Sequence, residues 1–234
     1  MPVYRLIDKV LFPPIEEAEE NGLLAAGGDL SPQRLLAAYR EGIFPWYSEG
    51  EPILWWSPDP RFVLFVDELH VSRSMRQFLK KEIVHITFDS AFKEVISSCS
   101  KPRPEQNGTW ITAEMQDAYL HLYNLGFAHS VEVWKDGVLV GGLYGVSLGR
   151  LFFGESMFSD IPNASKTALI KLDSFLREKG FTVIDCQVGS DHLGKLGARF
   201  ISRGEFFHIL KDSLRYNTLR GNWSEMRAPR GNDL

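Results

Sequence analysis

Residues 129–140 read His-Ser-Val-Glu-Val-Trp-Lys-Asp-Gly-Val-Leu-Val, and they predict the first hairpin of an antiparallel sheet. The Asp136-Gly137 pair lies between two runs rich in apolar and β-branched residues, which is a strong signal for a tight hairpin turn. A second glycine-containing turn separates the strands predicted at 138–147 and 151–158. The three segments together predict an antiparallel meander.

A helix and a further strand follow this meander. The helix is expected from Ala164 to Lys179, with Asn163 as its N-cap and Gly180 after its end. Residues 181–188, Phe-Thr-Val-Ile-Asp-Cys-Gln-Val, then predict a buried strand. This order indicates an α+β fold. It is also the element order of the acyltransferase (GNAT-like) fold of many N-acetyltransferases, with a mostly antiparallel sheet.

Upstream of the meander, the chain divides at Pro58-Asp59-Pro60, a turn that predicts a domain boundary. Residues 1–60 are rich in Pro, Gly and Trp and contain one clear helix, from Pro32 to about Glu41. We therefore expect a small N-terminal domain over 1–60 and the acyltransferase-type domain over 61–234. The last 40 or so residues are expected to be mixed helix and loop.

Composition excludes several classes of protein. The chain has 234 residues, 44% of them hydrophobic, and a net charge of −4, so a nucleic-acid partner must be held by a local basic patch. No apolar run approaches the roughly 20 residues of a membrane span, and the N-terminus lacks the pattern of a secretion signal. Cys99 and Cys186 are far apart and form no metal-ligand spacing. A cytoplasmic protein with reduced thiols is expected.

Two strands place polar side chains among apolar ones. Alternation puts Asp185 and Gln187 on one face of their strand and Cys186 on the other. A buried carboxylate is costly without hydrogen-bond partners, so this pair indicates either a structural link or a site. Alternation likewise puts Glu155 between Phe153 and Met157, which predicts either an anchor in a hydrophobic pocket or a carboxylate satisfied by its neighbours.

Basic and aromatic residues suggest how RNA could bind. Arg73, Arg76 and Lys80 fall on one face of a predicted short helix, followed by Lys81, and could grip a phosphate backbone or form a solvated surface. Tryptophans in Pro- or Gly-bounded loops could stack on unpaired bases or fill the core. The best stacking candidate is the turn Gly108-Thr109-Trp110-Ile111-Thr112, which leads into a helix with Tyr119.

These pieces together resemble the leucyl/phenylalanyl-tRNA–protein transferases of bacteria over nearly the whole chain. Several of the matching runs are long and unusual in composition. They are Asn21–Ala25, Gly27–Pro32, Gly42–Trp46, Pro52–Arg61, Gly108–Thr112, His129–Trp134, Gly154–Ser159, Asn163–Ala168 and Ile184–Val188.

The resemblance implies an activity. The enzyme would take Leu or Phe, less often Met, from Leu-tRNA or Phe-tRNA and join it to the free α-amine of a protein beginning with Arg or Lys. The product would be marked for N-end-rule degradation. No metal or small cofactor is expected, and the chain is expected to work as a monomer away from membranes.

The resemblance also implies roles for individual residues. The aspartate matched by Asp185 would hold and polarise the glutamine matched by Gln187, whose amide would help to deprotonate the attacking amine, and Glu155 is grouped with them as catalytic. The pocket for the donor side chain is expected to comprise Leu143, Phe153, Met157 and Leu172. Contacts with the 3′-terminal adenosine are expected from Tyr39, Trp46, Trp110 and Tyr119. The tRNA backbone is expected to be held by Arg73, Arg76, Lys80 and Lys81.

Some positions depart from the family pattern. Leu143 replaces a methionine, Leu172 replaces an aromatic residue, and Gly189-Ser190 replaces bulkier residues after the strand that carries Asp185. These differences leave the preference among Leu, Phe and Met open. Two other functions also remain as alternatives, namely a CoA-dependent N-acyltransferase and an RNA-end-binding module. The chain lacks the glycine-containing loop of acetyl-CoA enzymes, which argues against the first alternative.

Overall fold

The computed structural model describes residues 3–102 and 109–226, and its main feature is a seven-stranded sheet. The strand order is β11-β5-β10-β9-β8-β7-β6, and all neighbouring strands are antiparallel except β9 and β10, which are parallel. The strands are β5 (Arg61–Phe65), β6 (His85–Phe88), β7 (Ala128–Lys135), β8 (Val138–Leu148), β9 (Leu151–Ser159), β10 (Val183–Gln187) and β11 (Arg199–Ile201).

The predicted meander is formed by β7, β8 and β9. Asp136 and Gly137 at the first turn have φ angles of 51° and 77°. This left-handed conformation is what a two-residue hairpin turn of the favoured twist requires. The α+β class and the mostly antiparallel sheet predicted from the sequence are therefore confirmed.

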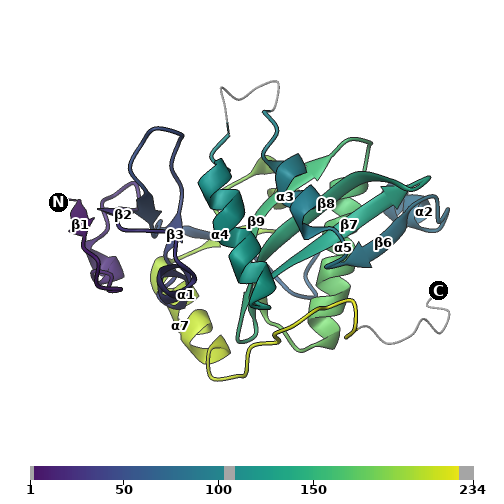
Figure 1. Ribbon diagram of the computed structural model, residues 1–234. Helices are drawn as coiled ribbons and strands as arrows, with labels where there is room; N and C mark the ends of the chain where they lie inside the picture. Colours follow the sequence, from purple (N-terminus) through teal and green to yellow (C-terminus); the bar gives the residue numbers. More distant parts are fainter. Residues whose placement is uncertain (1–2, 103–108, 227–234) are drawn as a thin grey trace.

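Helices cover both faces of the large sheet. On one face, hereafter the α3/α4 face, lie α3 (Phe92–Cys99) and α4 (Ala113–Asn124), as Figure 1 shows. On the opposite face, hereafter the α5 face, lies α5 (Ala164–Glu178), which connects β9 to β10. Each face has its own cluster of buried apolar side chains. The short helix α2 (Arg73–Leu79) lies next to β6 (Figure 1).

The N-terminal part contains more strands than the sequence predicted. A second sheet has the order β1-β2-β4-β3, and α1 (Pro32–Arg40) is the expected helix. Its strands are β1 (Tyr4–Leu6), β2 (Leu23–Gly27), β3 (Phe44–Pro45) and β4 (Leu54–Trp56), with a 3₁₀ turn, η1, at Ile15–Glu17. These strands were missed because they span only two to five residues among glycines and prolines.

The two sheets share one apolar cluster. The cluster on the α3/α4 face contains Tyr39 and Trp55 from the N-terminal part together with Tyr119 and Phe153 from the rest of the chain. The boundary at residue 60 separates the two sheets but not this cluster, so the division into two domains stays a prediction.

The last described residues form more than helix and loop. They include α6 (Asp191–Gly194), the unpredicted edge strand β11 and α7 (Arg203–Ser213), which lies near α1 (Figure 1). After α7 the chain runs to the α5 face, where Trp223 is fully buried and stacks on His129 with ring centroids 3.7 Å apart. The Trp223 N–H donates to Asp89, which also contacts His129 Nδ1. This contact fixes the C-terminal segment on the sheet.

Candidate active site

A β-bulge in β9 determines where its side chains point. The register with β8 shifts between Tyr144 and Gly145, so that Glu155 is the extra residue of β9. A bulge reverses the alternation of side chains beyond it. Phe153 accordingly packs on the α3/α4 face and Met157 on the α5 face. The prediction that Phe153, Glu155 and Met157 share one face is therefore wrong.

A cleft opens where β9 and β10 separate. The two strands pair only from Leu151 and Val183 to Phe153 and Asp185, and β9 then continues to Ser159 without this partner. The cleft has a volume of about 920 Å³. Its walls come from both faces of the sheet, from α3, α5 and α6, and from the loops around Trp46 and Trp110.

The cleft brings together about half of the site residues named from the sequence. Those that line it are Trp46, Trp110, Leu143, Glu155, Met157, Leu172 and Gln187. Ile184 and Leu169 extend its apolar wall. Gly108, the first residue of the predicted stacking turn, lies outside the described residues.

Besides the four basic residues around α2, four of the named residues do not line the cleft. Tyr39 and Tyr119 have no exposed surface and cannot stack on a nucleoside in this structure. Phe153 packs against Tyr39, with ring centroids 4.8 Å apart. Asp185 is also fully buried, behind Gln187 rather than in the cleft wall. These four side chains support the site from inside the protein.

Glu155 is the centre of a buried hydrogen-bond network. Tyr39 donates to its Oε1 at 2.7 Å, Tyr119 donates to its Oε2 at 2.9 Å, and Gln187 Nε2 donates to Oε1 at 2.9 Å. The two tyrosine hydroxyls also lie 2.5 Å from each other. The role of Tyr39 and Tyr119 in this structure is thus to hold Glu155.

The network requires one proton more than the tyrosines carry. Three oxygen–oxygen contacts join Glu155, Tyr39 and Tyr119, and the two hydroxyls supply only two protons. A protonated Glu155 supplies the third by donating to one tyrosine, whose own hydroxyl then donates to the other tyrosine instead of to the carboxyl group. Burial raises the pKa of Glu155 from 4.5 to about 7, against the lowering effect of its hydrogen bonds. The carboxyl group is therefore partly protonated near neutral pH.

Asp185 is held by a cation that the sequence reasoning did not pair with it. Arg61 Nε and Nη2 donate to the two carboxylate oxygens at 2.8 and 2.7 Å, and both residues are at most 1% exposed. The guanidinium lies over the rings of Phe44 and Phe206 at 4.8 and 4.6 Å. The sequence analysis assigned no partner to Arg61. The signal for its true position was Asp185 itself, because a buried carboxylate needs a cation or several donors.

Asp185 holds Gln187 through its backbone. The Gln187 N–H donates to Asp185 Oδ1 at 3.0 Å, whereas the Gln187 amide group binds Glu155. The expectation that Asp185 polarises the amide directly is corrected accordingly. Gln187 has a φ of 63°, in the left-handed region that favours glycine, and this places its side chain in the cleft.

The other polar groups show no sign of nucleophilic or metal chemistry in the described part of the chain. Burial raises the pKa of the Cys186 thiol well above its usual range, so this cleft residue stays neutral. No cluster of three potential metal ligands occurs among residues 3–102 and 109–226. Arg73, Arg76, Lys80 and Lys81 are exposed, and the last two lie beyond the end of α2.

Comparison with known proteins defines the class as transferases that act on aminoacyl-tRNA. A family model described as "Leucyl/phenylalanyl-tRNA protein transferase" matches residues 63–211, and the model of that family's N-terminal domain matches residues 28–59. The chain belongs to the leucyl/phenylalanyl-tRNA protein transferase family.

Relatives with that name match almost the whole chain. A leucyl/phenylalanyl-tRNA--protein transferase of Syntrophus aciditrophicus is 62% identical over 225 residues, which is 96% of this chain and 94% of the relative. One of Myxococcus xanthus is 54% identical over 231 residues, which is 97% of this chain and 99% of the relative. Among solved structures, an aminoglycoside acetyltransferase from a soil metagenomic sample has a TM-score of 0.40 at 15% identity, covering 49% of this chain and 85% of its own.

These relationships establish the coarse activity. The protein is an aminoacyltransferase whose substrates are aminoacyl-tRNA and an acceptor protein. Within the described residues, no helix has the length and apolar character needed to cross a membrane.

The buried ion pair predicts a double-mutant result. Arg61→Met should lower the free energy of unfolding by about 3–5 kcal/mol, because Asp185 is left buried without a cation. Arg61→Met combined with Asp185→Leu should recover part of this loss, because no charge remains buried. Urea denaturation measures both. If the double variant lost as much unfolding free energy as the single variants Arg61→Met and Asp185→Leu together, the pairing would be contradicted.

Glu155 predicts a pH dependence of stability. Between its unfolded pKa of 4.5 and its folded pKa of about 7, the folded protein binds the extra proton, so stability falls as pH rises through this range. The Glu155→Gln variant cannot ionise at this position and serves as the reference. Relative to it, the free energy of unfolding of the wild type should fall by up to about 3 kcal/mol between pH 5 and pH 8. Urea titrations at several pH values test this, and a constant difference between the two proteins would refute it.

Proposed function

We propose that this protein transfers Leu or Phe, less often Met, from aminoacyl-tRNA to the free α-amine of proteins that begin with Arg or Lys. The observation that carries this proposal is the cleft between β9 and β10, which combines an apolar wall with the polar pair Gln187 and Glu155. A product with a new N-terminal Leu or Phe would enter N-end-rule degradation. Aminoacyl-tRNA is used in the cytoplasm, so the reaction is assigned there.

The apolar wall fits the side chain of the donor amino acid. Leu143, Leu172, Met157 and Ile184 come from four different elements and line one part of the cleft. Burying a Leu or Phe side chain is worth about 1.5–3 kcal/mol. A polar or charged side chain would lose its hydration without gaining partners in this wall.

The adenosine end of the tRNA is assigned to Trp46 and Trp110. Both line the cleft, and Trp46 is 41% exposed while Trp110 is partly exposed. Stacking of a base on an aromatic ring is worth about 1–3 kcal/mol. Trp46 is itself supported by Trp56, whose indole N–H donates to the Trp46 carbonyl at 2.7 Å.

The chemistry requires little beyond positioning. The acceptor amine attacks the ester carbonyl carbon, a C–N bond forms, and the C–O bond to the terminal ribose breaks. Because Glu155 holds Nε2 of Gln187, the Gln187 amide oxygen is left to accept a hydrogen bond from the attacking amine. An amide oxygen is too weak a base to keep the proton, which passes to the leaving ribose oxygen. Orienting the two reactants supplies most of the acceleration.

Asp185 and Arg61 take part as positioning residues. They hold the backbone of Gln187 from behind and do not reach the cleft. The proposal also takes the enzyme to act as a monomer.

The decisive assay uses charged tRNA-Phe and a peptide that begins with Arg. The wild type should produce a Phe-extended peptide, and an N-acetylated version of the same peptide should give none. Gln187→Ala should lower kcat/KM by about 100-fold, while tRNA binding stays within a few-fold. Val138→Ala, which changes an exposed residue outside the cleft, is the control and should stay near wild type.

Two results would contradict the proposed activity, and a third would contradict the role of Gln187. Extension of the peptide only when acetyl-CoA is supplied would indicate a CoA-dependent acyltransferase. Binding of tRNA without any product would indicate an RNA-end-binding module. Normal turnover by Gln187→Ala would remove that residue from the mechanism.

The basic residues around α2 predict a change in salt dependence. Arg76→Glu with Lys80→Glu should weaken tRNA binding and reduce the slope of log K against log salt by about 1–2. Arg215→Glu, which changes an exposed residue after α7, is the control. An unchanged slope in the double variant would place the tRNA backbone elsewhere.

A further inference from the structure

Some buried polar atoms in the described residues have no hydrogen-bond partner. They are Arg61 Nη1, His129 Nε2, Tyr144 Oη, Ser147 Oγ and His192 Nε2. Leaving such an atom unpaired costs free energy, and native proteins contain few of them. Those that persist at a binding site are candidates for contacts that only the ligand completes. Of these five residues, only Tyr144 and His192 line the cleft.

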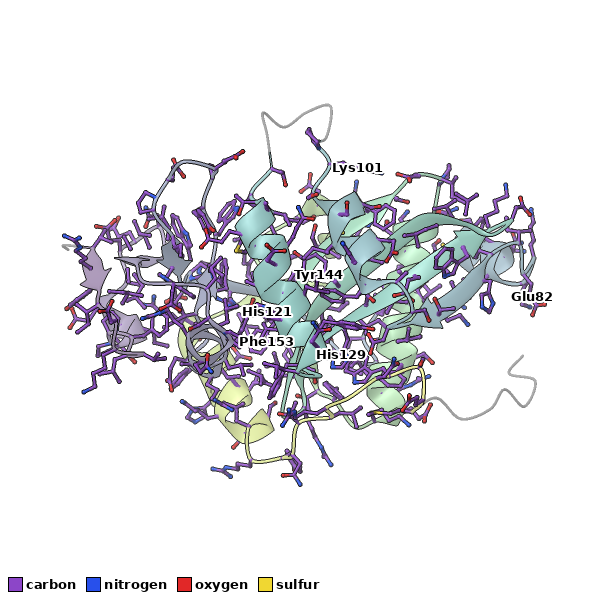
Figure 2. The ribbon with its side chains drawn as sticks, in the orientation of Figure 1. Glu82, Lys101, His121, His129, Tyr144 and Phe153 are labelled. Carbon is purple, nitrogen blue, oxygen red and sulfur yellow. The ribbon has the colours of Figure 1, made fainter. Side chains whose placement is uncertain are left out.

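Tyr144 lines the cleft, but its side chain and its hydroxyl are fully covered in the structure without a ligand. Its ring makes edge contacts with Phe92 of α3 and Tyr119 of α4, with centroids 5.8 and 5.5 Å apart. Figure 2 shows it in the interior of the molecule, beneath these two helices. Its partner on β9 is Ser156, next to the bulged Glu155. The hydroxyl therefore belongs to the same region as the network around Glu155 without being bonded to it.

The protonation state of Tyr144 defines the partner that it needs. Burial and the nearby Glu155 raise the pKa of Tyr144 well above 10. The hydroxyl keeps its proton at physiological pH and has that proton to donate. An acceptor oxygen is the complementary group, and the aminoacyl-adenosine end of a tRNA carries ester and ribose oxygens.

We propose that Tyr144 is a further substrate-binding residue: its hydroxyl is covered in the unliganded protein, becomes uncovered when the donor enters the cleft that Tyr144 lines, and then donates a hydrogen bond to an oxygen of the aminoacyl-adenosine. The inference rests on the proposed function for the identity of the donor. His192 lies on the four-residue helix α6, makes none of the hydrogen bonds to Glu155, and carries no such assignment.

The test removes the hydroxyl and keeps the ring. Tyr144→Phe should raise KM for phenylalanyl-tRNA, and Kd for the non-hydrolysable 3′-amide of phenylalanyl-adenosine, by about 5–30-fold, the size of one lost hydrogen bond. Its kcat should change less than about threefold. Without ligand, its unfolding midpoint in urea should equal or exceed that of the wild type, because an unpaired buried hydroxyl is gone.

Ser147→Ala is the matched control. Ser147 is also on β8, fully buried and unpaired, but it does not line the cleft. This variant should keep the wild-type KM and Kd. Like Tyr144→Phe, it should have an unfolding midpoint in urea that equals or exceeds that of the wild type.

The outcomes separate the inference from the function on which it rests. Equal Kd and KM values for Tyr144→Phe, Ser147→Ala and the wild type would overturn the role of Tyr144. If the wild type bound the 3′-amide analogue but extended no peptide, the proposed function would be contradicted. The ratio of the Kd values of Tyr144→Phe and Ser147→Ala for the analogue would still show whether the Tyr144 hydroxyl contacts it. Weaker binding by both variants alike would also overturn it, because the effect would then be structural.

Discussion

The buried pair of Arg61 and Asp185 is the constraint on which the rest of the site depends. Two opposite charges that are almost wholly removed from water must stay together, because separating them would leave an uncompensated charge in the core. The pair joins β5 to β10 and also engages aromatic rings from β3 and α7. Segments far apart in the sequence are thereby locked around the end of β10, where Gln187 adopts its left-handed conformation.

The bulge at Glu155 completes the arrangement from the neighbouring strand. An unbroken β9 would send every second residue from Leu151 onwards to the same face. The extra residue instead leaves Phe153 in the core beside Tyr39 and turns Met157 toward the α5 face. Glu155 then meets Gln187 across the gap between β9 and β10. One local irregularity thus produces a cleft with an apolar wall and a polar base.

Local signals predicted the regular elements well and the irregular ones badly. The helix predicted from Pro32 to about Glu41 lies at Pro32–Arg40, where proline is the first residue and Ser31 accepts a hydrogen bond from the Arg34 N–H as the N-cap. The bulge was missed although Gly154 carried a signal, since a lone glycine in a strand often marks such a site. Arg61 was missed because long-range pairing of charges leaves no periodic pattern. Tyr39 and Tyr119 were assigned to the adenosine, but both donate hydrogen bonds to Glu155. Glu155 lies 116 residues from Tyr39 and 36 residues from Tyr119 in the sequence, so no local pattern could show these contacts.

The proton shared around Glu155 has a consequence for how this protein interacts with its surroundings. A carboxyl group that is half titrated near neutrality takes up or releases hydrogen ions whenever a bound molecule alters its environment. The heat of binding measured by calorimetry then depends on the ionisation enthalpy of the buffer. In a living cell, the same coupling would make occupancy of the cleft respond to internal acidity.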